Sequence, residues 1–285
     1  MMGWRDPDVI ARIDRLDIPF NADGFDRYGV SREHLIRYFS ALKPVYERYL
    51  RVTSFDTECV PAGGRGVLVG NHSGGGAIDA LMVSASLFFD HEPPLFAHGL
   101  MEPFLAKIPF ANTLLSRVGQ FSGYSRHAEH LLVDERLLLA FPEGIRGSGK
   151  LYRERYQLGR FGTGFMRLAL KMKTPVIPFA FIGGEEAFPV IHNSRYLANL
   201  FRLDSFPIPT QLVPIPFPLA CQVYFGEPMY FEGTGNESDE RIAELVSRVR
   251  NEVQRMIDRG LSMRPSEIMV QRMPGADEPL TGGRR

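Results

Sequence analysis

The feature that most constrains this chain is an apolar run that ends in a turn dense with glycine. Val67 to Val69 are apolar and largely β-branched, a composition typical of a strand buried on both faces of a parallel sheet. The turn that follows reads Gly70-Asn-His-Ser-Gly-Gly-Gly76. Glycine permits backbone conformations that a Cβ forbids, and polar residues on such loops are favoured functional positions. We therefore expect a buried strand that delivers His72 to a functional site.

A partner for this histidine follows the turn. Asp79 stands just before the apolar segment 80–83 and is placed to start a helix, from which its carboxylate can turn back toward His72. A histidine held by a carboxylate can act as a general base, because its ordinary pKa of about 6.5 lies near neutral pH. The backbone N–H groups beside the histidine are candidate ligand donors: those of Ser73, Gly74, Gly75 and Gly76. Taken alone, such a histidine is more often structural than catalytic, so a second motif is needed.

Strand-like and helix-like segments alternate along the middle of the chain. The strand-like segments are 67–69, 95–97, 137–141, 176–181 and 222–225. The helix-like segments are 80–89, 101–107, 127–134 and 162–173, with amphipathic helices at 31–50 and 238–258. This alternation predicts an α/β fold, a single domain with a mostly parallel central sheet flanked by helices. Catalytic loops are then expected at the carboxyl ends of the strands.

The ends of the chain differ from this middle part. Residues 1–30 are charged and broken by proline and glycine, so we expect a loosely ordered lead-in before a domain over 31–260. Residues 261–285 are again rich in proline and glycine and suggest a flexible tail. Within the domain, residues 183–219 are apolar and proline-rich. Their sequence leaves two interpretations open, a surface that faces lipid or acyl chains and a plain packed crossover.

Composition excludes several function classes. The 285 residues include 33 Lys and Arg and 33 Asp and Glu, and this zero net charge gives no general attraction to nucleic acid. Cys59 and Cys221 lie far apart, which argues against a disulfide or a metal site and favours a reducing, cytoplasmic compartment. No segment has the roughly 18 uninterrupted apolar residues that a membrane-spanning helix needs. We expect a cytoplasmic protein that can lie on a membrane surface.

The second motif follows the strand-like segment 137–141 and reads Phe141-Pro-Glu-Gly-Ile-Arg146. Together with His72 and Asp79, which precede it, this motif resembles the glycerolipid acyltransferase superfamily, which includes the lysophosphatidic acid acyltransferases. Segment 119–126 is similar to the acceptor-binding block of that family, and segment 174–178 is similar to its last block. The resemblance covers about residues 60 to 230.

The chain also departs from the family pattern. Six residues separate His72 from Asp79, where the commonest pattern has four. Ile145 replaces the usual threonine, and His98 stands where many relatives carry a lysine. These departures bear on the acceptor more than on the reaction.

The resemblance implies transfer of a fatty acyl group from acyl-CoA or acyl carrier protein to a hydroxyl of a lipid, with a lysophospholipid as the favoured acceptor. It implies no metal or other cofactor, and a membrane surface as partner. His72 would take the hydroxyl proton and Asp79 would orient its ring. The residues implied to bind substrate are Ser73, Gly74, Gly75, Arg126, Glu143, Gly144 and Arg146. The arginines suit phosphates of the acceptor or of coenzyme A, and Glu143 would position the acceptor or Arg146.

Other interpretations remain open. A non-catalytic lipid-binding protein would use the same arginines and the same apolar loop. A nucleotide-binding protein is less favoured, because Gly144 to Lys150 follows a P-loop pattern but Leu151 replaces its magnesium-binding Ser or Thr. A lipase-like hydrolase would need a Gly-x-Ser-x-Gly elbow, which the chain lacks.

Overall fold

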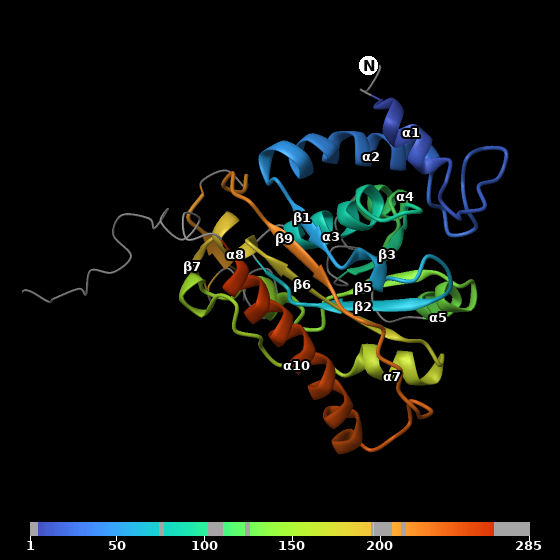
Figure 1. Ribbon diagram of the computed structural model, residues 1–285. Helices are drawn as coiled ribbons and strands as arrows, with labels where there is room; N and C mark the ends of the chain where they lie inside the picture. The colour runs from blue at the N-terminus through green and yellow to red at the C-terminus, as the bar shows by residue number, and fades with distance from the viewer. Residues whose placement is uncertain are drawn as a thin grey trace, which may run out of the picture.

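A mostly parallel sheet forms the centre of the protein (Figure 1). The computed structural model describes residues 5–73, 77–101, 111–122, 126–194, 196, 207–211 and 215–264. Within these residues the sheet has seven strands in the order β1-β9-β6-β2-β5-β3-β4. Their bounds are β1 Thr53–Phe55, β2 Gly66–Gly70, β3 Ala97–Met101, β4 Gln120–Ser122, β5 Leu137–Ala140, β6 Val176–Ile182 and β9 Gln222–Phe225.

Strand direction divides the sheet into two parts. β2 is parallel to both of its neighbours, β5 and β6, and β3 is parallel to β5 and β4. β9 is antiparallel to β6 and parallel to β1. The edge pair of β1 and β9 therefore runs opposite to the rest of the sheet. The expected α/β fold with a mostly parallel sheet is confirmed.

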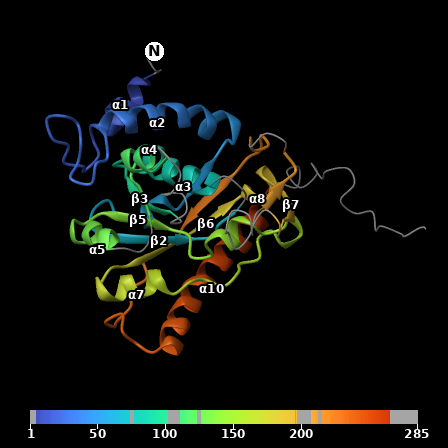
Figure 2. The same cartoon turned by 180° about the vertical axis from the view of Figure 1, so that it is seen from behind.

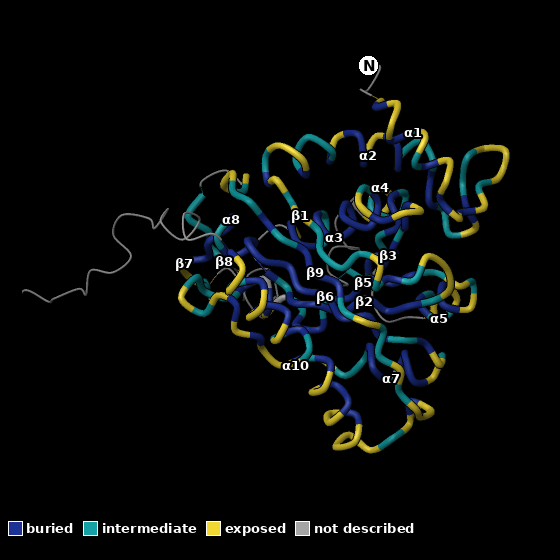
Figure 3. Tube along the Cα trace, viewed as in Figure 1, coloured by how far each residue is buried: buried dark blue, intermediate teal, exposed yellow. Residues whose placement is uncertain are grey.

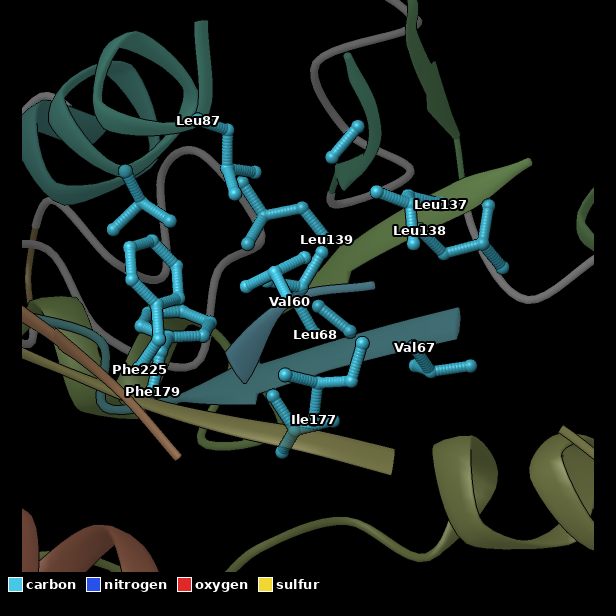
Figure 4. Close-up of a cluster of buried hydrophobic side chains, with 14 of the residues drawn as sticks. Val60, Val67, Leu68, Leu87, Leu137, Leu138, Leu139, Ile177, Phe179 and Phe225 are labelled. Atoms are coloured by element: carbon cyan, nitrogen blue, oxygen red, sulfur yellow. The ribbon is translucent and has the colours of Figure 1, made fainter. Parts of the chain in front are cut away.

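β2 owes its central place to its composition. All five of its residues are buried, as a strand covered on both faces requires. In Figure 4 the side chains of Val67 and Leu68 lie between those of Leu138 and Leu139 from β5 and Ile177 from β6. The apolar core therefore surrounds the strand that leads to His72.

Helices cover both faces of the sheet. On one face lies α3 (Ile78–Phe89), and α2 (Arg32–Pro44), which continues as the π-helix η1 (Val45–Tyr49), packs over it together with α1 (Pro7–Ile13). The other face carries α7 (Gly164–Lys171) and α10 (Asp239–Met263), as the view from behind in Figure 2 also shows. Shorter elements are η2 Thr57–Cys59, α4 Ala111–Arg117, α5 Arg126–Val133, α6 Ile145–Ser148, η5 Tyr152–Glu154, α8 Gly184–Ala187 and the strand pair β7 Val190–Asn193 and β8 Pro207–Pro209. Figure 3 shows the buried residues concentrated in the sheet and on the inward sides of these helices.

Most of the expected elements lie where the sequence predicts them, but β3 does not. The segment 95–97 was expected to be a strand, whereas β3 begins at Ala97. The N–H of Leu95 donates to the carbonyl of Leu87 in α3, so this residue closes the turn before the strand. Of the helix expected at 101–107, Met101 belongs to β3 and the rest lies outside the described residues.

The N-terminal residues differ from the expected loosely ordered lead-in. α1 begins with Pro7 directly after its cap Asp6, because a proline at the first helical position has no N–H to leave unpaired. Val9 and Ile13 are buried in the main core, and Lys43 of α2 lies 3.0 Å from Asp6. Charged residues of this segment therefore pair with α2 and with later parts of the domain, while its apolar residues join the core.

The last helix ends later than expected. The sequence predicts a helix over 238–258, whereas α10 continues to Met263. Gly260 is buried, and a Cβ there would collide with Ile182 and Tyr224. The absence of a side chain at Gly260 thus permits close packing of α10 on the sheet. The flexible tail expected at 261–285 can begin only after Arg264, and residues 265–285 lie outside the described residues.

Candidate active site

Three neighbouring strands end at the same place. β2 lies between β5 and β6, and the chain continues from their carboxyl ends to His72, Glu143 and Glu185 respectively. Loops at this edge of a parallel sheet are where ligands are expected to bind. The structure therefore brings the two sequence motifs together from the adjacent strands β2 and β5.

His72 and Asp79 are in direct contact. His72 Nδ1 lies 2.6 Å from Asp79 Oδ2. The aspartate is fully buried in the first turn of α3, where the helix dipole favours a negative charge. Its Oδ2 also accepts from Ser73 N–H at 2.7 Å, and its Oδ1 accepts from Ala80 N–H at 2.7 Å. Although six residues separate His72 from Asp79, the carboxylate still reaches the histidine.

This contact sets the chemistry of the imidazole. Burial disfavours the charged ring, but the Asp79 carboxylate, assisted by Glu143, raises the pKa of His72 above its ordinary value. When Nδ1–H donates to Asp79, Nε2 carries the lone pair that can take a proton. The ring packs on Phe141 with a centroid distance of 4.7 Å, and its side chain is 15% exposed. The arrangement suits a general base with limited access to solvent.

Ser73 does not present its N–H to a ligand. That N–H donates to Asp79 and so is not an available donor to an anionic oxygen, which corrects the expectation from sequence. The Ser73 hydroxyl is buried against Gly184 and finds no hydrogen-bond partner among the described residues. Gly74, Gly75 and Gly76 lie outside the described residues, and their role as donors stays a prediction.

Glu143 anchors the backbone of the histidine loop. Its Oε1 accepts from His72 N–H at 3.0 Å, and its Oε2 accepts from Gly159 N–H at 2.8 Å. The side chain is 1% exposed and lies 3.3 Å from Lys150 Nζ. These contacts link Glu143 to His72 itself, and its predicted effect on the acceptor or on Arg146 stays a prediction.

The two arginines lie at different distances along the sheet from His72. Gly144, with φ 58°, turns the chain after Glu143 into α6, which carries an exposed Arg146. Arg126 is the first residue of α5 and is exposed, just beyond β4 at the sheet edge. β5 and β3 separate β4 from β2, so the structure brings Arg146 to the site by topology and leaves Arg126 further along the sheet edge.

Sequence reasoning missed two residues that shape this site. The Asn71 side chain donates to the carbonyl of Phe181 and accepts from its N–H, each at 2.8 Å, which extends the β2–β6 pairing by one residue. A Cβ on Gly147 would lie 2.5 Å from Glu143 Cβ and 2.8 Å from His72 Cβ. An asparagine directly after a buried strand is a weak signal, and nothing in the sequence marks Gly147.

Lys150 and Glu185 were also missed as site residues. Lys150 was noted only as the end of a P-loop pattern, yet its Nζ lies 3.6 Å from Glu185 Oε1 as well as close to Glu143. Burial raises the pKa of Glu185 to about 7, against the opposing effect of Lys150. A lysine engaged in this way differs from one that holds a nucleotide phosphate.

His98 belongs to the core. It is fully buried in β3 beside the rings of Phe96 and Phe121, and burial lowers its pKa to about 3. A neutral histidine in this position packs as an aromatic ring.

Among the described residues, no group of three His, Cys, Asp or Glu side chains is placed to hold a metal ion. No helix in the same part of the chain combines the length and apolar character that crossing a membrane requires.

Comparison with known proteins places these observations in a family. The sequence profile of a family described as Acyltransferase matches residues 51–182. A protein of Mycobacterium tuberculosis described as uncharacterized is 31% identical over 241 residues, which are 81% of this chain and 65% of that protein. One of Mycobacterium leprae, also described as uncharacterized, is 30% identical over 252 residues, 85% of this chain and 67% of that protein. This chain thus spans less than two thirds of the length of the M. tuberculosis relative.

A solved structure shares the fold. The crystal structure of the 1-acyl-sn-glycerophosphate (LPA) acyltransferase PlsC from Thermotoga maritima aligns with a TM-score of 0.55 at 17% sequence identity. The alignment covers 82% of this chain and 83% of that chain, so the likeness extends over nearly the whole architecture.

Proposed function

We infer the reaction of this chain from the family to which it belongs, the glycerolipid acyltransferase superfamily. The chain acts as an acyltransferase that moves a fatty acyl group from acyl-CoA or acyl carrier protein to a lipid hydroxyl. A lysophospholipid is the acceptor, and the protein works in the cytoplasm on the surface of a membrane. The observation that carries this proposal is the contact of 2.6 Å between His72 and Asp79 at the carboxyl end of the central strand.

The reaction proceeds by direct attack. His72 Nε2 takes the proton of the acceptor hydroxyl while the hydroxyl oxygen attacks the thioester carbonyl carbon. The tetrahedral intermediate then collapses, the carbon–sulfur bond breaks, and the imidazolium gives its proton to the leaving thiolate. Asp79 stabilises the imidazolium and holds the ring tautomer, because its carboxylate accepts from Nδ1 throughout.

The remaining groups bind the two substrates. Arg146 and Arg126 are exposed cations whose planar guanidinium groups fit phosphate oxygens of the acceptor or of coenzyme A. We propose that the backbone N–H groups of Gly74 and Gly75 donate to the anionic oxygen of the intermediate. A phosphate-bearing acceptor explains why two arginines occur in the family motifs.

The test measures release of free coenzyme A from acyl-CoA by the purified protein in the presence of lipid vesicles. Vesicles contain lysophosphatidate, another lysophospholipid, diacylglycerol or a fatty alcohol, and acyl carrier protein replaces coenzyme A in a parallel series. His72→Ala is expected to lower acceptor-dependent release by about 10³-fold or more. His192→Ala, at an exposed histidine of β7, is the matched control and should retain wild-type release.

The alternative is a lipid-binding protein without catalysis. It predicts that wild type and His72→Ala bind vesicles equally well and that neither consumes any donor with any acceptor. That result, with both proteins folded by circular dichroism, would replace the proposed reaction by lipid binding.

A further inference from the structure

A lysine with a largely enclosed side chain joins the segments that follow β5 and β6. Lys150 Nζ lies 3.3 Å from Glu143 Oε2, after β5, and 3.6 Å from Glu185 Oε1, after β6. Its side chain is 10% exposed, and those of Glu143 and Glu185 are 1% and 3% exposed. One ammonium group therefore bridges two acidic side chains on the segments that follow β5 and β6.

Such a bridge is expected to contribute little to the stability of the folded protein. Removing an ammonium group and two carboxylates from water carries a large penalty, which their mutual attraction only partly repays. Lys150 also donates to the carbonyl of Gln157 at 3.4 Å, so its ammonium group is held from a third segment. An arrangement of this kind is better explained by the geometry that it fixes.

The geometry that it fixes is that of His72. Glu143 accepts from the backbone N–H groups of His72 and Gly159, and a Cβ on Gly147 would collide with both His72 and Glu143. Moving the Glu143 carboxylate therefore moves the backbone of the histidine. Glu185, the second acidic residue beside Lys150, fixes the ammonium group from the side of β6.

We propose that Lys150 is a positioning residue for the transfer reaction, which holds Glu143 against the backbone of His72 without touching either substrate. This inference depends on the proposed acyl transfer only where it predicts a change in kcat. Two enclosed carboxylates and a backbone carbonyl surround the ammonium group, so Lys150 is engaged within the protein. The sequence pattern that ends at this lysine thus serves the histidine loop rather than a nucleotide.

The experiment compares Lys150→Met, which removes the charge, with Lys150→Arg, which keeps it. Lys171→Met is the matched control, because Lys171 pairs with Glu129 on the surface and is 56% exposed. Lys150→Met should lower kcat by about 10- to 100-fold through misplacement of the base. It should leave KM for donor and acceptor within about twofold, since neither substrate contacts the lysine. Lys150→Arg should keep kcat within about threefold of wild type, as should Lys171→Met.

Amide hydrogen exchange, followed by NMR, gives a second measurement that needs no activity. Exchange at the His72 and Gly159 amides should become at least about tenfold faster in Lys150→Met and stay near wild type in the two controls. If Lys150→Met does not fold, Lys150→Gln replaces it, because the amide keeps hydrogen-bond donors while removing the charge.

The outcomes separate this inference from the proposed reaction. Wild-type kcat together with wild-type exchange at both amides in a folded Lys150→Met or Lys150→Gln variant would overturn the positioning role. Fast exchange in the variant, with a wild-type protein that transfers no acyl group, would uphold the positioning role and reject the reaction.

Discussion

At the scale of single residues, the site depends on which groups face His72. Asp79 occupies Nδ1, and the glutamate after β5 holds the histidine backbone, so the ring and its main chain are fixed from two sides. The sequence predicted the pair of His72 and Asp79 because both lie in one short segment. It could not predict the contact of Glu143 with the His72 amide, because the two lie 71 positions apart in the sequence and only the pairing of β2 with β5 brings them together.

The raised pKa of His72 predicts the pH dependence of the reaction. The base must be neutral, so kcat is expected to fall as the pH drops through a midpoint above 6.5. Asp79→Asn removes the main group that raises this pKa, so the midpoint should move to lower pH while kcat falls by about 10²- to 10⁴-fold. Steady-state rates between pH 5 and 9 check both shifts, and an unchanged midpoint in Asp79→Asn would contradict the assignment.

The same shift has a consequence for stability. A histidine whose pKa is raised on folding stabilises the folded protein fully below its unfolded pKa of about 6.5, and this contribution is lost as pH rises through the folded value. The contribution should disappear in Asp79→Asn, which urea unfolding at acid and alkaline pH can measure.

Gly147 is predicted to tolerate no side chain. In Gly147→Ala the new methyl group would lie 2.8 Å from His72 Cβ and closer still to Glu143, so the histidine loop must shift. We expect kcat to fall by about 10-fold or more, because small displacements of a catalytic base are costly. Gly63→Ala is the control, since a Cβ there has no atom within 4 Å. Equal rates for the two variants would show that the loop can adjust.

At the scale of elements, periodicity predicted the long helices and the buried strands but not how they end. The apolar positions of α10 predicted this helix. The packing role of Gly260 could not be predicted, because it depends on Ile182 and Tyr224 in the sheet. The three-residue strands β1 and β4 were not predicted, because so short a segment carries no period of its own. β1 becomes a strand through its partner β9.

The packing of α10 provides a test at this scale. Gly260→Ala places a methyl group against Ile182 and Tyr224 and is expected to reduce the free energy of unfolding by about 1–3 kcal/mol. Ser262→Ala, at an exposed position of the same helix, should stay within about 0.5 kcal/mol of wild type. Urea denaturation measures both. A neutral Gly260→Ala would mean that the helix can move away from the sheet.

At the scale of the whole molecule, alternation of strands and helices was enough to predict the α/β fold, but not its outer layer. This layer could not be predicted, because it forms only when α2 buries apolar residues against α3, which itself covers the sheet. Phe39 of α2 stacks on Phe88 of α3 with a centroid distance of 3.8 Å, and both rings are fully buried. The matched profile begins at residue 51, after this layer.

The outer layer is therefore expected to be part of the folding unit. Phe39→Ala should reduce the free energy of unfolding by about 3–5 kcal/mol, because it opens a cavity between two helices. Tyr230→Ala, at a ring that is 74% exposed, is the control and should change it by less than about 0.5 kcal/mol. Removal of residues 1–50 should abolish cooperative thermal unfolding. A truncated chain that melts like wild type would make the N-terminal helices an independent addition.

The reversed pair of strands at the sheet edge sets an order of events during synthesis. β1 comes early in the chain, but its partner in the sheet, β9, ends at Phe225. A ribosome releases the chain from its N-terminus, so β1 emerges long before the strand that pairs with it. The parallel strands from β2 to β6 can associate while β1 and one side of β6 still lack a neighbour. The sheet is complete only when β9 inserts between β1 and β6. A chain stalled before residue 222 would expose the unpaired edges of β1 and β6 to chaperones and to other chains.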